Sequence, residues 1–239
     1  MQRNTLNTVY RGEERGSTDL GWLKSWHSFS FGSFQNPNRM GFGPLRVIND
    51  DRVEGGRGFG AHPHRDMEII SLVYSGQLQH RDNLGNGDLL EAGDVQYMSA
   101  GTGVVHSEFN PATDEPVHFL QIWIEPDQKG YPPAYARHRR LGRGVADGWE
   151  EVLSGSDDAA IRIRQDVRLS TASLAPQGSI RRRVEENREG WLQVVSGEIE
   201  VDHLVLREGD SVILPSGFDL QLQANLAAEL ILFQVLIQE

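Results

Sequence analysis

Two pairs of ligand-type side chains stand out in this sequence, each with one residue between its members. His62 and His64 form the first pair, and His106 and Glu108 form the second. Side chains of a β-strand alternate between its two faces, so this spacing puts both members of a pair on one face. Two neighbouring strands are then enough to bring three imidazoles and one carboxylate together. The pattern predicts a metal site.

The donor types narrow the choice of metal. Imidazole combined with carboxylate suits Fe, Mn, Co, Ni, Cu or Zn, whereas Mg and Ca prefer oxygen ligands. The chain contains no cysteine, which excludes thiolate sites and disulfides. Four protein ligands leave positions open on a six-coordinate ion, and an open site favours chemistry over a structural role. Glu68 shares the parity of His62 and His64 if the strand is regular, so it is a further candidate.

An internal repeat indicates which elements hold this site. The Ser-Gly step at 75–76 recurs at 196–197, and the Gly-Asp step at 93–94 recurs at 209–210. Alternating apolar segments flank these turns in both copies, which is typical of strands. A repeat of about 120 residues is too long for a solenoid unit and suits two β domains in tandem. We expect an N-terminal domain over residues 1–126, a linker over 127–158 and a C-terminal domain over 159–239.

The second copy lacks the histidines of the first. Counting from the shared glycines places other residue types at the positions of His62, His64, His106 and Glu108: Arg183, Glu185, Leu222 and Ala224. The ligand-type residues are therefore not simply demanded by the fold. The comparison predicts one metal ion per chain, bound in the N-terminal domain.

Charge and hydropathy restrict the partners. The 239 residues carry a formal net charge of −11, and a field of that sign repels phosphate backbones, so direct nucleic acid binding is not expected. The first 30 residues contain no apolar run of signal-peptide length, and no apolar stretch is long enough to span a membrane. We expect a soluble cytoplasmic protein with no membrane partner.

The motifs resemble those of a known family. Gly56, His62, His64, Glu68 and Gly76 are spaced much as in the first cupin motif, with one extra residue before the closing glycine. The second motif is similar over residues 93–110, with serine in place of the usual proline and two extra residues before the histidine. The amino-acid sequences of residues 62–68 and 98–108 specifically resemble the pirin family of bicupins. Within that family they look most similar to the bacterial members described as quercetin 2,3-dioxygenases.

The resemblance implies an all-β bicupin, with two tandem β-barrel domains of the jelly-roll or cupin type. It also implies one metal ion bound by His62, His64, His106 and Glu108. In the pirin pattern the carboxylate after the last histidine is the ligand, so Glu68 becomes a candidate to orient a ligating imidazole. Fe(II) is the expected ion, with Mn, Co, Ni, Cu or Zn as alternatives.

Two functions of different classes follow from the resemblance. The first is a metal-dependent dioxygenase that cleaves a flavonol such as quercetin with release of carbon monoxide, with Glu108 as the catalytic base. Its partners are a small aromatic substrate and dioxygen. The alternative is a metal- or redox-responsive regulatory protein that binds a protein partner, as the likeness to eukaryotic pirin suggests. An enzyme predicts a cavity at the metal with room for a two-ring ligand.

Other residues carry weaker expectations. Phe42, Phe59, Phe109 and Met98 are candidates to line an apolar pocket beside the metal. The N-terminal aromatic residues are expected in the core or in a lid over the barrel mouth: Trp22, Trp26, Phe29, Phe31 and Phe34. The remaining histidines have no spacing that predicts metal binding: His27, His80, His118, His138 and His203.

Overall fold

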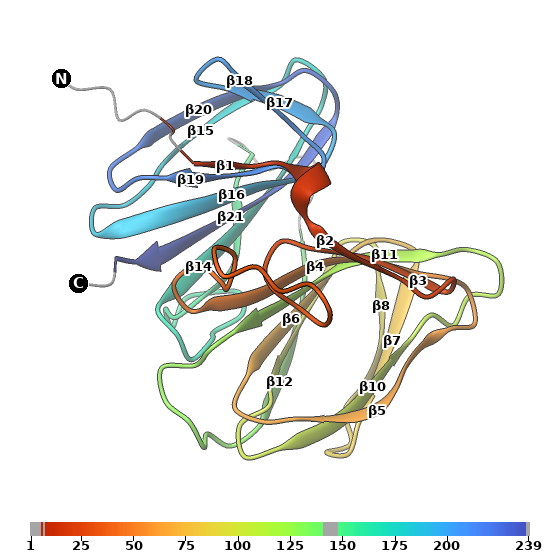
Figure 1. Ribbon diagram of the computed structural model, residues 1–239. Coiled ribbons are helices and arrows are strands. Elements are labelled where there is room, and N and C mark those ends of the chain that lie inside the picture. Colours follow the sequence, from red (N-terminus) through yellow and green to blue (C-terminus); the bar gives the residue numbers. More distant parts are fainter. Residues whose placement is uncertain (1–5, 7, 141–147, 238–239) are drawn as a thin grey trace. The chain divides into compact units, whose positions relative to one another are not determined.

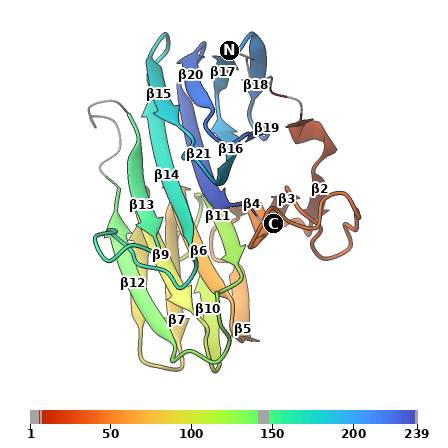
Figure 2. The same cartoon turned by 90° about the vertical axis from the view of Figure 1, so that its left-hand side faces the viewer.

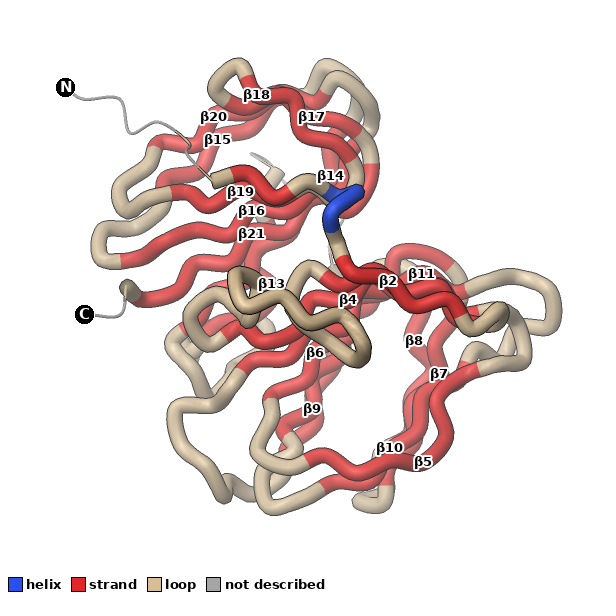
Figure 3. The backbone as a smooth tube through the Cα atoms, in the orientation of Figure 1, coloured by secondary structure: helices blue, strands red, loops and turns tan. Residues whose placement is uncertain are grey.

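The protein is almost entirely β structure. The computed structural model describes residue 6 and residues 8–140 and 148–237, and these form two compact units. The first unit contains Gly16–Arg140 together with Ile163–Gln165, and the remaining described residues form the second. Within the described part, the only helical element is a short 3-10 turn, η1 (Gly12–Glu14), drawn as the one blue segment of Figure 3. None of the described helices is long and apolar enough to cross a membrane.

The first unit is a sandwich of two antiparallel sheets. A seven-stranded sheet has the order β12-β9-β6-β11-β4-β3-β2. Its strands are β2 (Gly16–Asp19), β3 (Leu23–His27), β4 (Leu45–Val53), β6 (Glu68–Ser75), β9 (Asp94–Ser99), β11 (Val117–Ile124) and β12 (Ala134–Arg139). The opposing sheet has the order β5-β10-β7-β8. Its strands are β5 (Gly58–His64), β7 (Gln77–Asp82), β8 (Gly87–Glu91) and β10 (Val104–Phe109).

The two sheets of this unit face each other across a core that changes character along the strands. Figure 1 shows β5, β7, β8 and β10 as a layer opposite β4, β6 and β11, and Figure 2 shows β7, β10 and β5 side by side. One end of the interior is apolar, where Val73, Leu78, Leu90 and Phe119 pack together. Elsewhere the inward positions of β5 and β10 include His62, His64, His106 and Glu108. The sandwich therefore presents these polar side chains to its interior.

The second unit repeats this architecture. A six-stranded sheet has the order β1-β19-β16-β21-β14-β13. Its strands are β1 (Val9–Tyr10), β13 (Glu150–Ser154), β14 (Val167–Leu174), β16 (Arg188–Ser196), β19 (Ser211–Leu214) and β21 (Ala228–Leu236). The opposing sheet has the order β15-β20-β17-β18. Its strands are β15 (Ser179–Arg183), β17 (Glu198–Val201), β18 (Leu204–Arg207) and β20 (Asp219–Ala224). The expected all-β fold of two tandem domains is confirmed, each domain being a two-sheet sandwich.

The structure divides the chain differently from the expected ranges 1–126, 127–158 and 159–239. β1 pairs with β19, which places the first described residues in the second unit. β12 lies inside the expected linker but pairs with β9 of the first unit, and β13 pairs with β14 of the second. Hydrogen bonding to distant strands, which local composition does not reveal, decides these assignments. Residues 141–147 of the expected linker lie outside the described part.

Candidate metal centre

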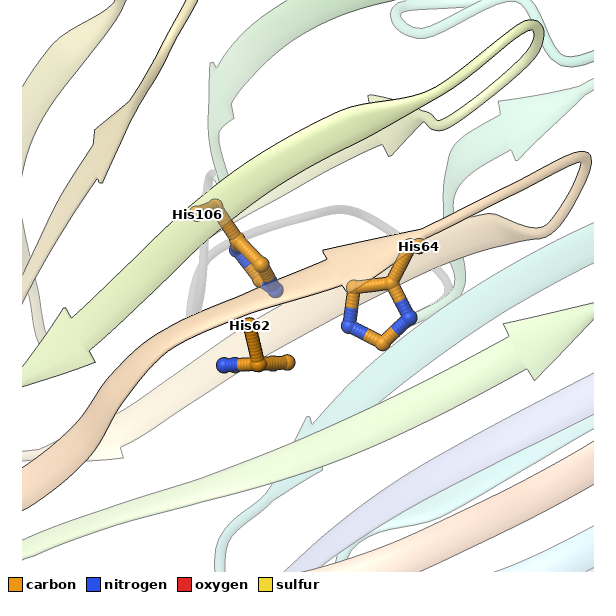
Figure 4. A group of neighbouring side chains, drawn as sticks. All are labelled: His62, His64 and His106. Carbon is orange, nitrogen blue, oxygen red and sulfur yellow. The ribbon is translucent and has the colours of Figure 1, made fainter.

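Three imidazoles meet where β5 and β10 pair. The antiparallel register places His106 opposite His62 and Val104 opposite His64. The ring centroids lie 4.8 Å apart for His62 and His64, 4.5 Å for His62 and His106, and 4.9 Å for His64 and His106. Figure 4 shows the three rings converging from these two strands. One ring nitrogen from each lies within 4.8 Å of the others, a spacing that can hold a metal ion.

The hydrogen bonds leave ring nitrogens ready to bind a metal. His62 Nδ1 lies 2.7 Å from the carbonyl oxygen of Gly60, and because a carbonyl only accepts, the proton sits on Nδ1 and Nε2 keeps its lone pair. His106 Nε2 is buried and has no hydrogen-bond partner. Buried polar atoms are nearly always paired, so this orphaned nitrogen fits a metal ligand. The donor set suits a divalent transition metal.

Burial keeps two of these imidazoles neutral. It lowers the pKa of His64 to about 4, and the electrostatic interaction with His62 adds to the shift. It lowers the pKa of His106 to about 3, again with contributions from neighbouring histidines. Only a neutral imidazole has a lone pair for a metal, so protons compete little for these ligands near neutral pH.

Glu108 lies beside this group and is held by polar neighbours. Its carboxylate is buried, accepting a hydrogen bond from Ser71 Oγ at 3.1 Å and one from Gln121 Nε2 at 2.7 Å. Burial raises its pKa above the usual range, although these hydrogen bonds act in the opposite direction. β10 shifts register against β5 between His106 and Glu108. Glu108, His106 and His80 form a second group whose possible ligand atoms lie within 4.8 Å of one another.

The residue pattern did not single out His80, which the structure brings into the site. His80 lies on β7 opposite Glu108, with its Nδ1 3.4 Å from His106 Nδ1. Its Nε2 lies 3.4 Å from Asp82 Oδ2, and hydrogen bonds from Asn86 and Leu84 outweigh burial to hold the pKa of Asp82 below its usual value. An ionised carboxylate thus orients His80, which contacts His106. The only sign of this arrangement in the sequence is that His80 and Asp82, like the other pairs, are separated by one residue.

Glu68 has different partners from those expected. Its side chain is fully buried, and Oε2 accepts hydrogen bonds from the Tyr97 hydroxyl and, at 3.1 Å, from the backbone N–H of Arg164. Neither group of possible metal ligands in the described residues includes it. The parity count fails because Asp66, with φ of 63°, turns the chain between β5 and β6. Glu68 starts a strand of the opposing sheet, and no hydrogen bond to an imidazole supports a role in orienting one.

A cavity of about 280 Å³ adjoins the imidazoles, close to the lower end of the ~300–1,000 Å³ range of small-molecule sites. His62, His64 and Glu108 line it together with aromatic side chains. Trp123 packs edge-on against His64 with ring centroids 5.0 Å apart, and Phe31 packs against Trp123. Of the expected apolar lining, Phe59 belongs to the wall, whereas Phe42, Phe109 and Met98 do not.

The seven-stranded sheet supplies polar side chains to the cavity, besides Leu23 and Trp123. These polar side chains include Ser25, Asn49, Asp51 and Gln121, which lie on the inner face of the sheet. Burial raises the pKa of Asp51 to about 7, and the charges of Asp50 and Glu108 add to the shift while a hydrogen bond from Ser25 opposes it. The cavity is therefore lined both by imidazoles that can bind a metal and by side chains that can form hydrogen bonds.

The second unit has no comparable group among the described residues. β15 and β20 pair as β5 and β10 do, with Ile180 opposite Leu222 and Arg182 opposite Leu220. The register therefore matches Ile180 and Arg182 to His62 and His64, in place of the Arg183 and Glu185 found by counting. The count failed because the path to the shared glycine is longer in this unit, running 17 positions from Ile180 to Gly197 against 14 from His62 to Gly76. Leu222 and Ala224, which the count matches to His106 and Glu108, are buried.

Known families match both units. Residues 9–124 match the family described as Pirin, and residues 152–235 match the one described as Quercetinase C-terminal cupin domain. A protein of Escherichia coli K12 named quercetin 2,3-dioxygenase is 38% identical over 226 residues, which cover 94% of this chain and 96% of that protein. The chain belongs to the pirin family. The resemblance read from the motifs is thereby confirmed, and with it the bicupin fold.

Relatives within this family bear more than one description. A protein of Caulobacter vibrioides described as pirin-like is 40% identical over 223 residues, covering 92% of this chain and 95% of that one. The solved structure of E. coli YhhW, a bacterial pirin in complex with nickel(II), has a TM-score of 0.88 and 37% identity, covering 97% of this chain and 100% of that one. A member of the same family thus binds a divalent metal.

Proposed function

We propose that this protein is a metal-dependent dioxygenase of the quercetin 2,3-dioxygenase type, acting on a flavonol. The observation that carries the proposal is the placement of His62, His64 and Glu108 in the wall of one cavity. A purely structural metal site closes its coordination shell, whereas a catalytic one adjoins space for a substrate. The name of the E. coli relative, quercetin 2,3-dioxygenase, supports the same reaction class.

His62, His64 and His106 hold the metal in this proposal, with Glu108 as the fourth ligand. When bound, the ion supplies Lewis-acid and redox chemistry toward the substrate and dioxygen. We propose Fe(II) as the native ion, because imidazole and carboxylate donors with open positions suit it. The nickel(II) complex of YhhW makes Ni(II) the first alternative to test.

Glu108 is the proposed base. Its carboxylate accepts the proton of the flavonol hydroxyl, so the substrate O–H bond breaks as a carboxyl O–H bond forms. Burial raises the pKa of Glu108, which improves its match to a weakly acidic hydroxyl. Ser71 and Gln121 fix the two carboxylate oxygens, and Phe31, Phe59 and Trp123 supply apolar walls for aromatic rings.

The overall reaction balances with dioxygen as the only co-substrate. The two carbon–carbon bonds that flank the hydroxyl-bearing carbon break, and that carbon leaves as carbon monoxide. Both dioxygen atoms enter the ring-opened ester, and the proton held by Glu108 returns to the carboxylate of that product. The protein's contribution is to orient the substrate, accept its proton and exclude water from the reacting carbons.

The test is quercetin consumption by metal-loaded protein under air and under argon, with carbon monoxide trapped by a reduced haem protein. We expect substrate loss and carbon monoxide in equal amounts, only under air and only with metal. Val105→Ala is a matched control, since Val105 lies on the same strand with its side chain partly exposed. Equal substrate loss with chelated protein would mean ordinary autoxidation and would put the interaction-protein alternative ahead.

A further inference from the structure

A row of buried polar side chains crosses the inner face of the seven-stranded sheet. The register aligns one residue from each of five neighbouring strands, all less than a tenth exposed: His27, Asn49, Gln121, Ser71 and Gln96. Asp51 lies on the same face of β4 and is 4% exposed. Burying polar groups costs free energy unless they find partners. The partners of this row therefore indicate what it is for.

Part of the row is satisfied within the fold. His27 Nδ1 donates to Asn49 Oδ1 at 2.8 Å, and Thr18 Oγ1 lies 2.9 Å from His27 Nε2. Gln121 uses its Nε2 to donate to Glu108. Three buried atoms of cavity-lining residues have no hydrogen-bond partner: Asp51 Oδ1, Gln121 Oε1 and Trp123 Nε1. Unpaired buried atoms grouped around one cavity point to a bound molecule or ordered water.

The three atoms define the chemistry of that molecule. Asp51 and Gln121 offer acceptors, so the ligand must bring hydroxyl or amine donors, and Trp123 offers an N–H for a ligand oxygen. Asp51 pairs with Phe119, two residues before Gln121 on the next strand, and such diagonal neighbours lie about 7–8 Å apart. Both side chains can reach one ring system. The same cavity is also lined by Phe31, Phe59 and Trp123.

We propose that Asp51 and Gln121 form a subsite that binds hydroxyl groups of the substrate other than the one deprotonated at Glu108. This inference rests on the proposed function and names the substrate class as polyhydroxylated aromatics. Trp123 Nε1 donates to an oxygen of the same substrate. A site with buried acceptors discriminates against analogues that lack the hydroxyls, because the acceptors are then left unpaired.

The experiment compares two flavonols that share the hydroxyl and carbonyl pair facing the metal. Quercetin carries further hydroxyls on its outer rings, and 3-hydroxyflavone carries none there. Their dissociation constants are measured under argon with metal-loaded protein, so that binding is separated from turnover. The proteins are wild type, Asp51→Ala, Asp51→Asn and Asp50→Asn. Asp50 is the matched control, a buried carboxylate on the other face of the same strand that binds His118 instead.

We expect wild type to bind quercetin more tightly than 3-hydroxyflavone by a factor of about 10 or more, a size typical of one or two buried hydrogen bonds. Asp51→Ala removes most of this preference while binding 3-hydroxyflavone as wild type does. Asp51→Asn, which keeps an acceptor oxygen, restores part of it, and Asp50→Asn leaves it intact. An unchanged preference in Asp51→Ala would overturn the subsite and assign the unpaired atoms to ordered water.

Different results would refute the dioxygenase proposal and the subsite proposal. Hydroxyl-dependent binding without carbon monoxide release would keep the subsite and refute the dioxygenase. Turnover of both flavonols with no Asp51-dependent preference would keep the dioxygenase and refute the subsite. Circular dichroism of each variant shows whether it is folded, and Asp51→Asn provides a near-isosteric replacement if Asp51→Ala does not fold.

Discussion

Individual side chains at the site have distinct tasks because their surroundings differ. His64 and His106 are kept neutral by burial, whereas Glu108 is buried but receives two hydrogen bonds that fix its orientation. In the proposed function the histidines only bind the metal, whereas Glu108 both binds it and accepts a proton. Substitutions at His106 and Glu108 are expected to separate the two functions.

His106→Ala removes one of three imidazoles and should abolish stoichiometric metal binding. Glu108→Gln keeps a ligand oxygen and the contacts of a side chain of equal size, so we expect it to retain most of the metal. Loss of the base should lower turnover by about 10²–10⁴ fold. Elemental analysis and quercetin turnover on the same samples test this. Full metal and full activity in Glu108→Gln would show that Glu108 is not the base.

His80 and Asp82 should tune the metal centre without binding the ion themselves. Groups that orient a ligating imidazole are typically worth about 10–100 fold in metal affinity, so His80→Ala and Asp82→Asn are expected to weaken binding by that much. Competition with a chromogenic chelator measures the affinity. His203→Ala, an exposed histidine of the second unit, is the control. Unchanged affinity in both variants would reduce His80 to a packing residue.

Asp51 should make stability depend on pH in the metal-free protein. Its pKa rises from 3.8 unfolded to about 7 folded, so the folded state favours the protonated form and loses stability as pH rises from 4 to 7. Asp51→Asn does not lose this stability, because asparagine has no carboxyl group to titrate. Its stability relative to wild type should increase over that range by at most about 4 kcal/mol. Denaturant unfolding at pH 4.5 and pH 8 tests this, and a pH-independent difference would contradict it.

Strand pairing sets the site at the scale of elements. The register between β5 and β10 puts His62 opposite His106, and the turn at residues 101–103 sets where β10 begins. Gly101 has φ of 45°, and a Cβ there would meet the carbonyl oxygen of Tyr131 at 2.1 Å. The same turn accepts a hydrogen bond from the backbone N–H of Asp66 at 2.8 Å. Gly101 therefore ties the turn after β5 to the turn before β10.

Gly101→Ala should destabilise the first unit and weaken metal binding together. The left-handed conformation alone costs about 1–2 kcal/mol for a residue with a Cβ, and the clash with Tyr131 adds to this. Gly87→Ala is the control, because its Cβ meets only atoms at ordinary contact distance. Thermal unfolding and metal titration check the pair. Equal melting temperatures for the two variants would show that the turn does not constrain β10.

The whole molecule keeps two sandwiches but places ligands in one of them. The inward pairs of the second unit are apolar or cationic, with Ile180 opposite Leu222 and Arg182 opposite Leu220. Such side chains pack a core or repel a cation. The described residues of the second unit therefore offer no counterpart of the three-imidazole group.

Metal-replete protein should contain one equivalent of transition metal per chain. The expectation follows from the three-imidazole group of the first unit and from the absence of any similar group in the described residues of the second. Elemental analysis after removal of loosely bound ions gives the ratio, and His106→Ala supplies the background. Two equivalents that survive this treatment would reveal a second site.

The sequence by itself determined the features that depend on local geometry. Strand alternation places residues two apart on one face, so His62 and His64, and likewise His106 and Glu108, could be paired without a structure. The repeated turns predicted two β domains, and the amino-acid sequences of the two motifs predicted the family. Each of these rests on residues close together in the chain.

Only the tertiary structure decided which distant strands meet. His80 enters the site because β7 pairs with β10, Glu68 leaves it because the chain turns at Asp66, and β1 joins the second unit by pairing with β19. The polar row ending at Gln96 exists only once five strands are in register. Hydrogen bonds between strands far apart in sequence set these contacts, and local patterns of residues do not encode them individually.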